Sequence, residues 1–241
     1  MVKEKKITIL KNGPYLVEGN VPLAEKLNVL KTHRVHELVE GRELPQAETY
    51  LLCSCGHSSN PPFCDGAHET IDYDGTETAP CEKYRKRAKR VEGPNLTMLD
   101  DGRCALAKFC HGEKGNAWTL TMSSNYPDCK EAAIIAASNC PTGRLVALDD
   151  EGNEIENTYE PSIDIIQEPI QEFSSGIFVK GGIPLVSESG KVYETRNRYM
   201  LCRCGHSYIK PFCDGAHMEF NFVDNKAAKK KKKKKEKKSS K

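Results

Sequence analysis

Two groups of cysteine and histidine residues carry the clearest chemical signal in this chain. Each group reads Cys-x-Cys, then eight residues, Cys, three residues and His. The first group consists of Cys53, Cys55, Cys64 and His68, and the second of Cys202, Cys204, Cys213 and His217. Three thiolates and one imidazole suit a tetrahedral zinc ion, and they equally suit a [2Fe–2S] cluster, whose two irons take two protein ligands each. The repeated pattern therefore predicts two metal centres.

The spacing within each group bears on the identity of the metal. Ligand types alone slightly favour zinc, but structural zinc sites usually separate paired ligands by two to four residues, and Cys-x-Cys is unusual there. The step from Cys64 to His68 places both side chains on one face of a helix that begins there. Asp65 is placed to cap that helix, and we expect Gly66 to let the backbone pass close to the metal. Buried structural cysteines, the alternative, would require the same coincidence twice.

The sequence around these ligands resembles the CDGSH iron–sulfur proteins. Their signature, Cys-x-Cys-x2-Ser-x3-Pro-x-Cys-Asp-Gly-Ala-His, is filled at every position in both segments. The matching residues are Cys53, Cys55, Ser58, Pro62, Cys64, Asp65, Gly66 and His68, and then Cys202, Cys204, Ser207, Pro211, Cys213, Asp214, Gly215 and His217. Ala67 and Ala216 stand where the family name has serine. The resemblance implies two [2Fe–2S] clusters, each held by three cysteines and one histidine, and it covers the two end segments but not the middle.

The repeat extends beyond the ligands. Residues 13–23 match residues 175–185, and each half runs Tyr-(Leu/Met)-Leu directly into its first cysteine. Internal duplication is therefore visible in the sequence. The halves alternate short apolar runs with Gly and Pro turns, which predicts strands at 7–10, 15–18, 177–180 and 199–201. Because the resemblance implies dimers of intertwined strands, we expect a loop-rich α+β fold in which the halves pair as an internal pseudo-dimer, and a monomer in solution.

A further set of cysteines lies in the middle of the chain. Five residues separate Cys104 from Cys110, and Cys140 is followed by proline. Bacterial ferredoxins use a Cys-x2-Cys-x2-Cys run and a remote Cys-Pro, and Ala107 stands where the middle cysteine of that run belongs. The segment resembles a divergent single-cluster ferredoxin domain, which implies a [3Fe–4S] or [4Fe–4S] cluster on these three thiolates. Free core cysteines are the alternative, and Cys129 matches no ferredoxin ligand position although it could supply a fourth ligand.

These features divide the chain into five parts. They are a first CDGSH half (1–75), a basic linker (76–92), a ferredoxin-like α/β insert (93–170), a second CDGSH half (171–225) and a disordered lysine-rich tail (226–241). Within the insert, residues 118–121 are predicted to form a strand and residues 130–138 a short buried helix.

Composition and charge indicate the surroundings of the protein. Eleven cysteines with a polar N-terminal segment and no apolar stretch of membrane-spanning length favour a reducing, cytoplasmic location and metal binding over disulfides. Residues 226–241 hold eleven lysines and one glutamate, which leaves 25 basic and 33 acidic residues for an acidic folded body. The tail suits a solubilising role or contact with an anionic partner. No aromatic residue is interleaved with its lysines, so no specific nucleic acid partner is expected.

The leading functional interpretation is a multi-cluster redox protein. It would carry electrons or hand over iron–sulfur clusters to redox or apo-cluster partner proteins. The chain contains no Gly-rich phosphate loop and no Ser/His/Asp arrangement, so we expect a carrier rather than an enzyme. The alternative is a zinc-stabilised interaction module in which the polybasic tail makes the contact.

Overall fold

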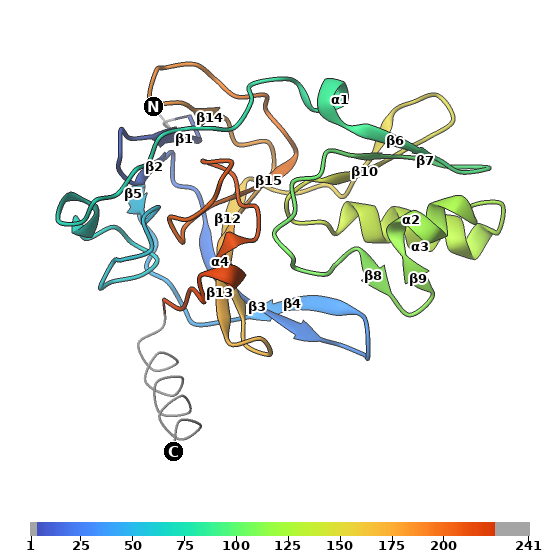
Figure 1. The fold of residues 1–241 in the computed structure, drawn as a ribbon, viewed down its shortest axis with the longest axis horizontal. Helices are drawn as coiled ribbons and strands as arrows, with labels where there is room; N and C mark the ends of the chain where they lie inside the picture. The colour runs from blue at the N-terminus through green and yellow to red at the C-terminus, as the bar shows by residue number, and fades with distance from the viewer. Residues whose placement is uncertain (1–3, 225–241) are drawn as a thin grey trace.

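The computed structural model describes residues 4–224, and the first of its sheets combines strands from both ends of the chain (Figure 1). Its order is β14-β1-β2-β5. Strands β1 (Lys6–Ile9), β2 (Tyr15–Glu18) and β5 (Thr49–Leu52) come from the first half, and β14 (Leu185–Val186) comes from the second. Strand β5 runs directly into Cys53, so this sheet positions the first ligand group.

The second sheet has the complementary composition. Its order is β15-β13-β12-β3-β4. Strands β13 (Phe173–Lys180) and β15 (Arg198–Leu201) belong to the second half, and β3 (Leu23–Leu30) and β4 (His36–Glu40) belong to the first. Strand β12 (Ser162–Glu168) comes from the end of the segment predicted as the insert and pairs with β13 of the second half. Strand β15 leads into Cys202 in the same way that β5 leads into Cys53.

The halves thus exchange strands: β14 joins the first sheet, and β3 and β4 join the second. Strand β14 pairs in parallel with β1, with Ile7 opposite Leu185, and β3 pairs in parallel with β12, with Ile163 opposite Leu23. The antiparallel pairs β2/β5 and β13/β15 correspond in the same way. This reciprocal exchange confirms the predicted α+β fold with an internal pseudo-dimer, and the four predicted strands are present as β1, β2, β13 and β15.

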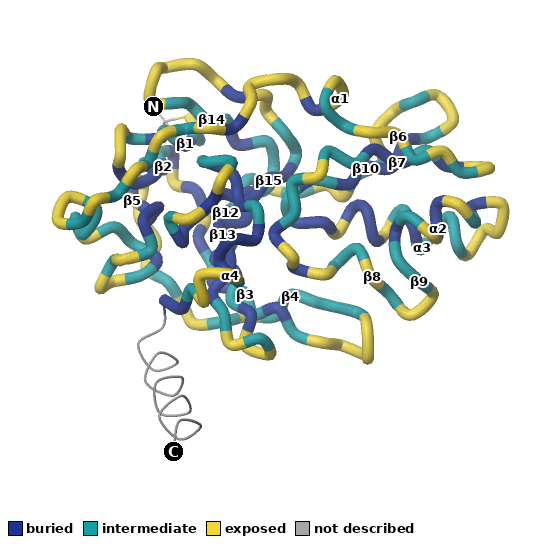
Figure 2. Tube along the Cα trace, in the orientation of Figure 1, coloured by how far each residue is buried: buried dark blue, intermediate teal, exposed yellow. Residues whose placement is uncertain are grey.

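One apolar core holds the two sheets together. It draws on both halves, and Figure 2 shows buried chain along β12 and β13. Fully buried members include Ile7, Val17 and Leu52 from the first half, Ile163 from β12, and Ile177 and Leu201 from the second half. Because burial of each such side chain contributes about 1.5–3 kcal/mol, neither half retains its stability without the other.

The middle block forms a separate sheet with its own core. The sheet order is β11-β10-β7-β6, all neighbours being antiparallel. Its strands are β6 (Lys89–Glu92), β7 (Thr97–Asp100), β10 (Leu145–Leu148) and β11 (Glu154–Ile155). A two-stranded ribbon of β8 (His111–Gly112) and β9 (Gly115–Asn116) lies near the helices (Figure 1).

Two helices cover this sheet, and one of them corrects the sequence prediction. The predicted helix is present as α3 (Pro127–Ser138). Residues 118–121, predicted as a strand, instead belong to helix α2 (Ala117–Met122). The side chain of Asn116 accepts a hydrogen bond from the Thr119 amide and starts this helix as part of a capping box. The four-residue alternation Trp-Thr-Leu-Thr is too short to distinguish a strand from a helix, and the capping box favours the helix.

The segment predicted as a basic linker is partly folded. It contains the one-turn helix α1 (Tyr84–Arg87) and the start of β6. The buried Tyr84 hydroxyl donates to the carbonyl oxygens of Leu99 and Arg144, which fastens the segment to the middle sheet. The predicted disordered tail lies outside the described residues. Among residues 4–224, no helix combines the length and apolar character needed to cross a membrane.

Candidate metal centres

The first ligand group is brought together as two pairs. The Sγ atoms of Cys53 and Cys55 lie 3.6 Å apart, and the Sγ atom of Cys64 lies 3.4 Å from Nδ1 of His68. The first pair sits on the loop after β5. The second pair sits at the start of a single 3-10 turn, η1 (Ala67–Glu69), where the sequence predicted a helix.

The second ligand group repeats this arrangement. The Sγ atoms of Cys202 and Cys204 are 3.5 Å apart, and Sγ of Cys213 is 3.6 Å from Nδ1 of His217. His217 belongs to the one-turn helix α4 (Ala216–Glu219). All eight predicted residues are thus found in two equivalent Cys/Cys plus Cys/His arrangements.

The grouping of the ligands into Cys/Cys and Cys/His pairs bears on whether they suit a single metal ion or a cluster. Within residues 4–224, no three or more His, Cys, Asp or Glu side chains are arranged to hold a single metal ion. A [2Fe–2S] cluster needs a different arrangement, because each of its two irons takes two protein ligands. One Cys/Cys pair and one Cys/His pair supply that donor set.

Backbone hydrogen bonds fix the loops that carry the pairs. The Cys53 amide donates to the Pro62 carbonyl oxygen at 2.8 Å, and the Cys64 amide donates to the Leu51 carbonyl oxygen at 2.9 Å. In the second centre, Cys202 donates to Pro211 and Cys213 donates to Met200 at the same two distances. Each motif loop is therefore hydrogen-bonded back to the strand from which it emerges.

The residues between the last two ligands shape the turn that carries them. The Asp65 carboxylate accepts hydrogen bonds from the amides of Ala67 and Ser59, at 3.1 and 2.7 Å, and so caps the turn as expected. The Gly66 amide lies 3.4 Å from the Cys64 sulfur, so the backbone passes close to one of the predicted ligands. The φ of +86° at Gly66 is a further reason for glycine, since an L side chain is strained in that region.

Hydrogen bonding between the two thiols of each Cys/Cys pair favours one thiolate per pair. The thiol of Cys55 and the backbone amides of Ser58 and Gly56 lower the pKa of Cys53 to about 5, although burial opposes the shift, while the same hydrogen bond and burial raise the pKa of Cys55. The pKa of Cys202 is likewise lowered, to about 7, by the Cys204 thiol, and that of Cys204 is raised. The first cysteine of each pair is thus the one favoured as a thiolate, the form that binds metal.

The two centres differ in exposure. Cys213 and His217 are 3% and 2% exposed, whereas Cys64 and His68 are only half-buried. Burial, followed by the charge of Arg203, lowers the pKa of His217 to about 4. The second centre therefore has the better shielded histidine, held neutral as a ligand must be.

The two motif loops are packed directly against each other. A Cβ on Gly56 would lie 2.5 Å from the Cys204 carbonyl oxygen, and a Cβ on Gly205 would lie 2.6 Å from the Cys55 carbonyl oxygen. The contact is reciprocal, as the pseudo-symmetry of the fold requires. Each centre thus depends on the position of the other loop.

Tyr15 strengthens this contact between the halves. Its buried hydroxyl donates to the Cys202 carbonyl oxygen at 2.8 Å, and the equivalent position of the second half is Ile177, which makes no such bond. We expect Tyr15→Phe to lower the free energy of unfolding by about 1 kcal/mol, because it leaves a buried carbonyl with one partner fewer. Urea unfolding measures this, with Tyr208→Phe, which removes an exposed hydroxyl, as the control. Equal stability of Tyr15→Phe and the wild type would contradict the role assigned to the hydroxyl.

The middle cysteines also come together. Cys104, Cys110 and Cys140 line one cavity, while Cys129, which belongs to α3, is not among its lining residues. The Leu106 amide points to the Cys104 sulfur at 3.3 Å. Burial, followed by the nearby Cys140 and Cys104 sulfurs, raises the pKa of Cys110 to about 11. The structure thus brings the three predicted ligands to one cavity.

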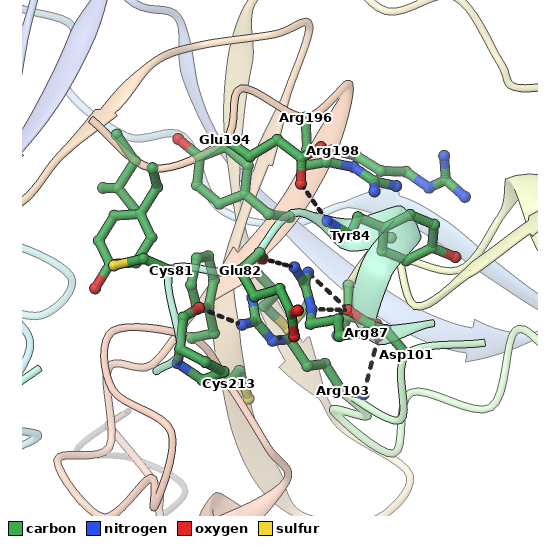
Figure 3. A pocket seen from close by; sticks show the side chains of 18 residues that line it. Cys81, Glu82, Tyr84, Arg87, Asp101, Arg103, Glu194, Arg196, Arg198 and Cys213 are labelled. Atoms are coloured by element: carbon green, nitrogen blue, oxygen red, sulfur yellow. Dashed lines mark hydrogen bonds and ion pairs between the residues drawn. The ribbon is translucent and has the colours of Figure 1, made fainter. Parts of the chain in front are cut away.

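The loop that carries Cys104 contacts the second centre. A Cβ on Gly215 would lie 2.9 Å from the Leu106 side chain and 3.2 Å from the Cys104 carbonyl oxygen. Arg198, on the strand that enters the second motif, donates to the Cys140 carbonyl oxygen at 2.8 Å. Figure 3 shows Arg198 and Cys213 on the walls of the cavity at this junction.

Sequence reasoning overlooked Arg203, which lies between two ligands of the second centre. Its guanidinium is buried, pairs with the Asp224 carboxylate and donates to the carbonyl oxygens of Ser175 and Ile166. The first centre has Ser54 at this position. The sequence did contain a signal for this residue, because the second Cys-x-Cys loop has arginine at the position where the first has serine.

Comparison with known proteins agrees with this geometry. The family model described as iron-binding zinc finger, CDGSH type, matches residues 12–69 and 175–218. These two segments contain all eight paired ligands, while the middle cysteines lie outside both. No curated protein and no solved structure matches the chain.

Proposed function

The chain belongs to the CDGSH iron-binding family, with two copies of the family's domain, and from this we propose that each copy holds one [2Fe–2S] cluster. The pairwise grouping of the ligands carries the proposal. Cys53 with Cys55 would hold one iron of the first cluster, and Cys64 with His68 would hold the other. A single zinc ion would instead need all four donors to converge on one point.

The second copy would hold its cluster in the same way. Cys202 with Cys204 and Cys213 with His217 repeat the two pairs at nearly the same distances. When bound, such clusters supply one-electron transfer. The protein's own residues contribute the thiolates, exclude water around the second centre and keep His217 unprotonated.

A third cluster is proposed for the middle cysteines. Cys104, Cys110 and Cys140 offer three thiols to one cavity, which suits a [3Fe–4S] cluster or a [4Fe–4S] cluster with a fourth ligand of another type. Cys129 is left out of this set because it does not line the cavity. The hydroxyl of Thr142, which does line it, lies 3.2 Å from the Cys140 sulfur.

The cellular role that fits this arrangement best is electron transfer along the chain. The close approach of the Cys104 backbone to Gly215 supports contact between the middle cavity and the second centre. The reciprocal packing of Gly56 and Gly205 supports contact between the second centre and the first. We infer a relay in the order first centre, second centre, middle cluster, with partner proteins at the two ends.

Iron and sulfide quantitation tests the number of clusters. We expect about seven or eight irons per wild-type chain, because two [2Fe–2S] clusters account for four and the middle cluster adds three or four. Cys110→Ser is expected to reduce the count to about four. Cys129→Ser, the matched control in the same block, is expected to leave it unchanged.

Spectroscopy on the same samples separates iron–sulfur from zinc. A red-brown protein with an electron paramagnetic resonance signal after reduction is expected, whereas a colourless protein with zinc would contradict the proposal. Four irons in both the wild type and Cys110→Ser would reject the middle cluster and leave the two [2Fe–2S] clusters standing.

A further inference from the structure

A cavity of about 440 Å³ lies away from both paired centres. Three parts of the chain form it: the β3–β4 hairpin, the loop and ribbon at 108–116, and the turn between β12 and β13. Its volume is within the range of small-molecule sites in proteins. Lys108 lines both this cavity and the one that holds the middle cysteines, so the two are neighbours.

One wall of the cavity contains an incompletely bonded carboxyl group. Glu168, at the end of β12, is 5% exposed, and its Oε1 atom has no hydrogen-bond partner. Its Oε2 atom accepts from Nδ2 of Asn28 at 2.9 Å. A buried polar atom without a partner costs about 1–3 kcal/mol, so its persistence beside a cavity points to a ligand that supplies the missing bond.

The neighbours of Glu168 hold it in a fixed orientation. Nδ2 of Asn28 also donates to the Ala107 carbonyl oxygen at 3.1 Å, while its Oδ1 accepts from Nδ1 of His36 at 2.8 Å. The side chain of Asn28 is therefore fully engaged and cannot turn to satisfy the second oxygen of Glu168. Burial raises the pKa of Glu168 to about 7, so its protonated form is well populated near neutral pH.

The charged groups around Glu168 determine which ligand suits the site. The β3–β4 hairpin contributes His33, Arg34 and His36, and the cysteine loop contributes Lys108 and His111. Glu168 is the only acid among the lining residues, and no other titratable group lines the cavity from β12 or the turn that follows it. Burial, followed by the charge of Lys108, lowers the pKa of His36 and so favours its neutral form. Two permanent cations and a carboxylic acid able to donate a hydrogen bond favour an anion.

We propose that this cavity binds a small organic anion through a phosphate or carboxylate group, which accepts a hydrogen bond from protonated Glu168 and pairs with Lys108 and Arg34. The site is distinct from the eight paired ligands and from the middle cysteines. It gives the protein a small-molecule ligand next to the middle block, in addition to the proposed electron transfer.

Calorimetric titration of the full-length purified protein with sulfate and with succinate at pH 6 tests the site. We expect at least one probe to bind, and the tighter of the two identifies a phosphate-like or a carboxylate ligand group. Glu168→Ala is expected to weaken binding about tenfold or more, the usual effect of losing a hydrogen bond to a charged group. Lys108→Met is expected to weaken it as well, whereas Lys191→Met, a charge-matched control outside the cavity, leaves it unchanged.

The dependence on pH isolates Glu168 from the histidines. Sulfate keeps its charge between pH 6 and 8, but Glu168 loses its proton as pH rises through about 7. Wild-type affinity for sulfate should therefore fall about tenfold over this range from Glu168 alone. Glu168→Gln keeps a permanent donor of the same shape, so its affinity should match the wild type at pH 6 and exceed it about tenfold at pH 8.

Because the histidines are present in both proteins, their titration cancels in this comparison. Binding of neither probe at pH 6 would overturn the proposal. So would wild-type affinity in Glu168→Ala, or a ratio of Glu168→Gln to wild-type affinity that is the same at pH 6 and pH 8. An unchanged visible spectrum in each variant verifies that the metal centres are intact.

Discussion

Gly205→Ala is expected to destabilise the protein by about 3–5 kcal/mol and to disrupt both paired centres. The added Cβ would lie 2.6 Å from the Cys55 carbonyl oxygen, a distance at which the backbone itself must move. The φ of +85° adds the strain of a left-handed conformation, about 1–2 kcal/mol for a residue with a side chain. Gly56→Ala should behave alike, because its Cβ would lie 2.5 Å from the Cys204 carbonyl oxygen.

Gly190 provides the matched control for this prediction. Its φ is +82°, but a Cβ there would meet nothing within 4 Å. Gly190→Ala should therefore lose only about 1 kcal/mol of stability, from the strained backbone conformation, and should retain a full complement of iron. Urea unfolding and iron quantitation on the three variants measure the difference. If Gly205→Ala were no less stable than Gly190→Ala, the two motif loops would not be packed as described.

Much of the paired centres could be predicted from the sequence because their information is local and duplicated. The two ligand groups, the strands near them and the duplication of the halves follow from patterns within short windows that occur twice. The strand exchange was implied by the family resemblance, and the register of β1 with β14 and of β3 with β12 bears it out.

The failures arose where a distant partner or a single polar contact decides the structure. Helix α2 was mistaken for a strand because four residues fit both periods, and the Asn116 cap was not weighed. The contacts of Arg203 and the lining of the Glu168 cavity involve residues far apart in the chain, so no local sequence pattern predicts them.

Arg198→Met should be comparably damaging, and it tests the attachment of the middle block. Arg198 is fully buried, and its guanidinium donates to the carbonyl oxygens of Cys140, Ala137 and Leu145 while it pairs with the Glu156 carboxylate. Methionine would fill part of the space but leave three carbonyls and one carboxylate without this partner. Removing one member of a buried ion pair costs about 3–5 kcal/mol.

A second substitution distinguishes the lost charge from the lost volume. Arg198→Met combined with Glu156→Leu removes the unpaired carboxylate, so we expect it to recover about 1–3 kcal/mol of the loss in urea unfolding. Arg196→Met, two residues away, removes only a cation placed over the Tyr84 ring and should cost about 1 kcal/mol or less. Equal stabilities of Arg196→Met and Arg198→Met would contradict the assignment.

The consequence for the metal centres follows from where Arg198 lies. Arg198 is the first residue of β15, the strand that leads to Cys202. Its side chain donates a hydrogen bond to the carbonyl oxygen of Cys140, a ligand of the proposed middle cluster. Loss of that bond should release the Cys140 loop while the pairs of the second centre keep their own backbone bonds to Pro211 and Met200. The iron count of Arg198→Met should therefore fall toward about four, with the spectrum of the [2Fe–2S] clusters retained. A parallel loss of both cluster types would instead mean that the middle block and the second centre form one cooperative unit.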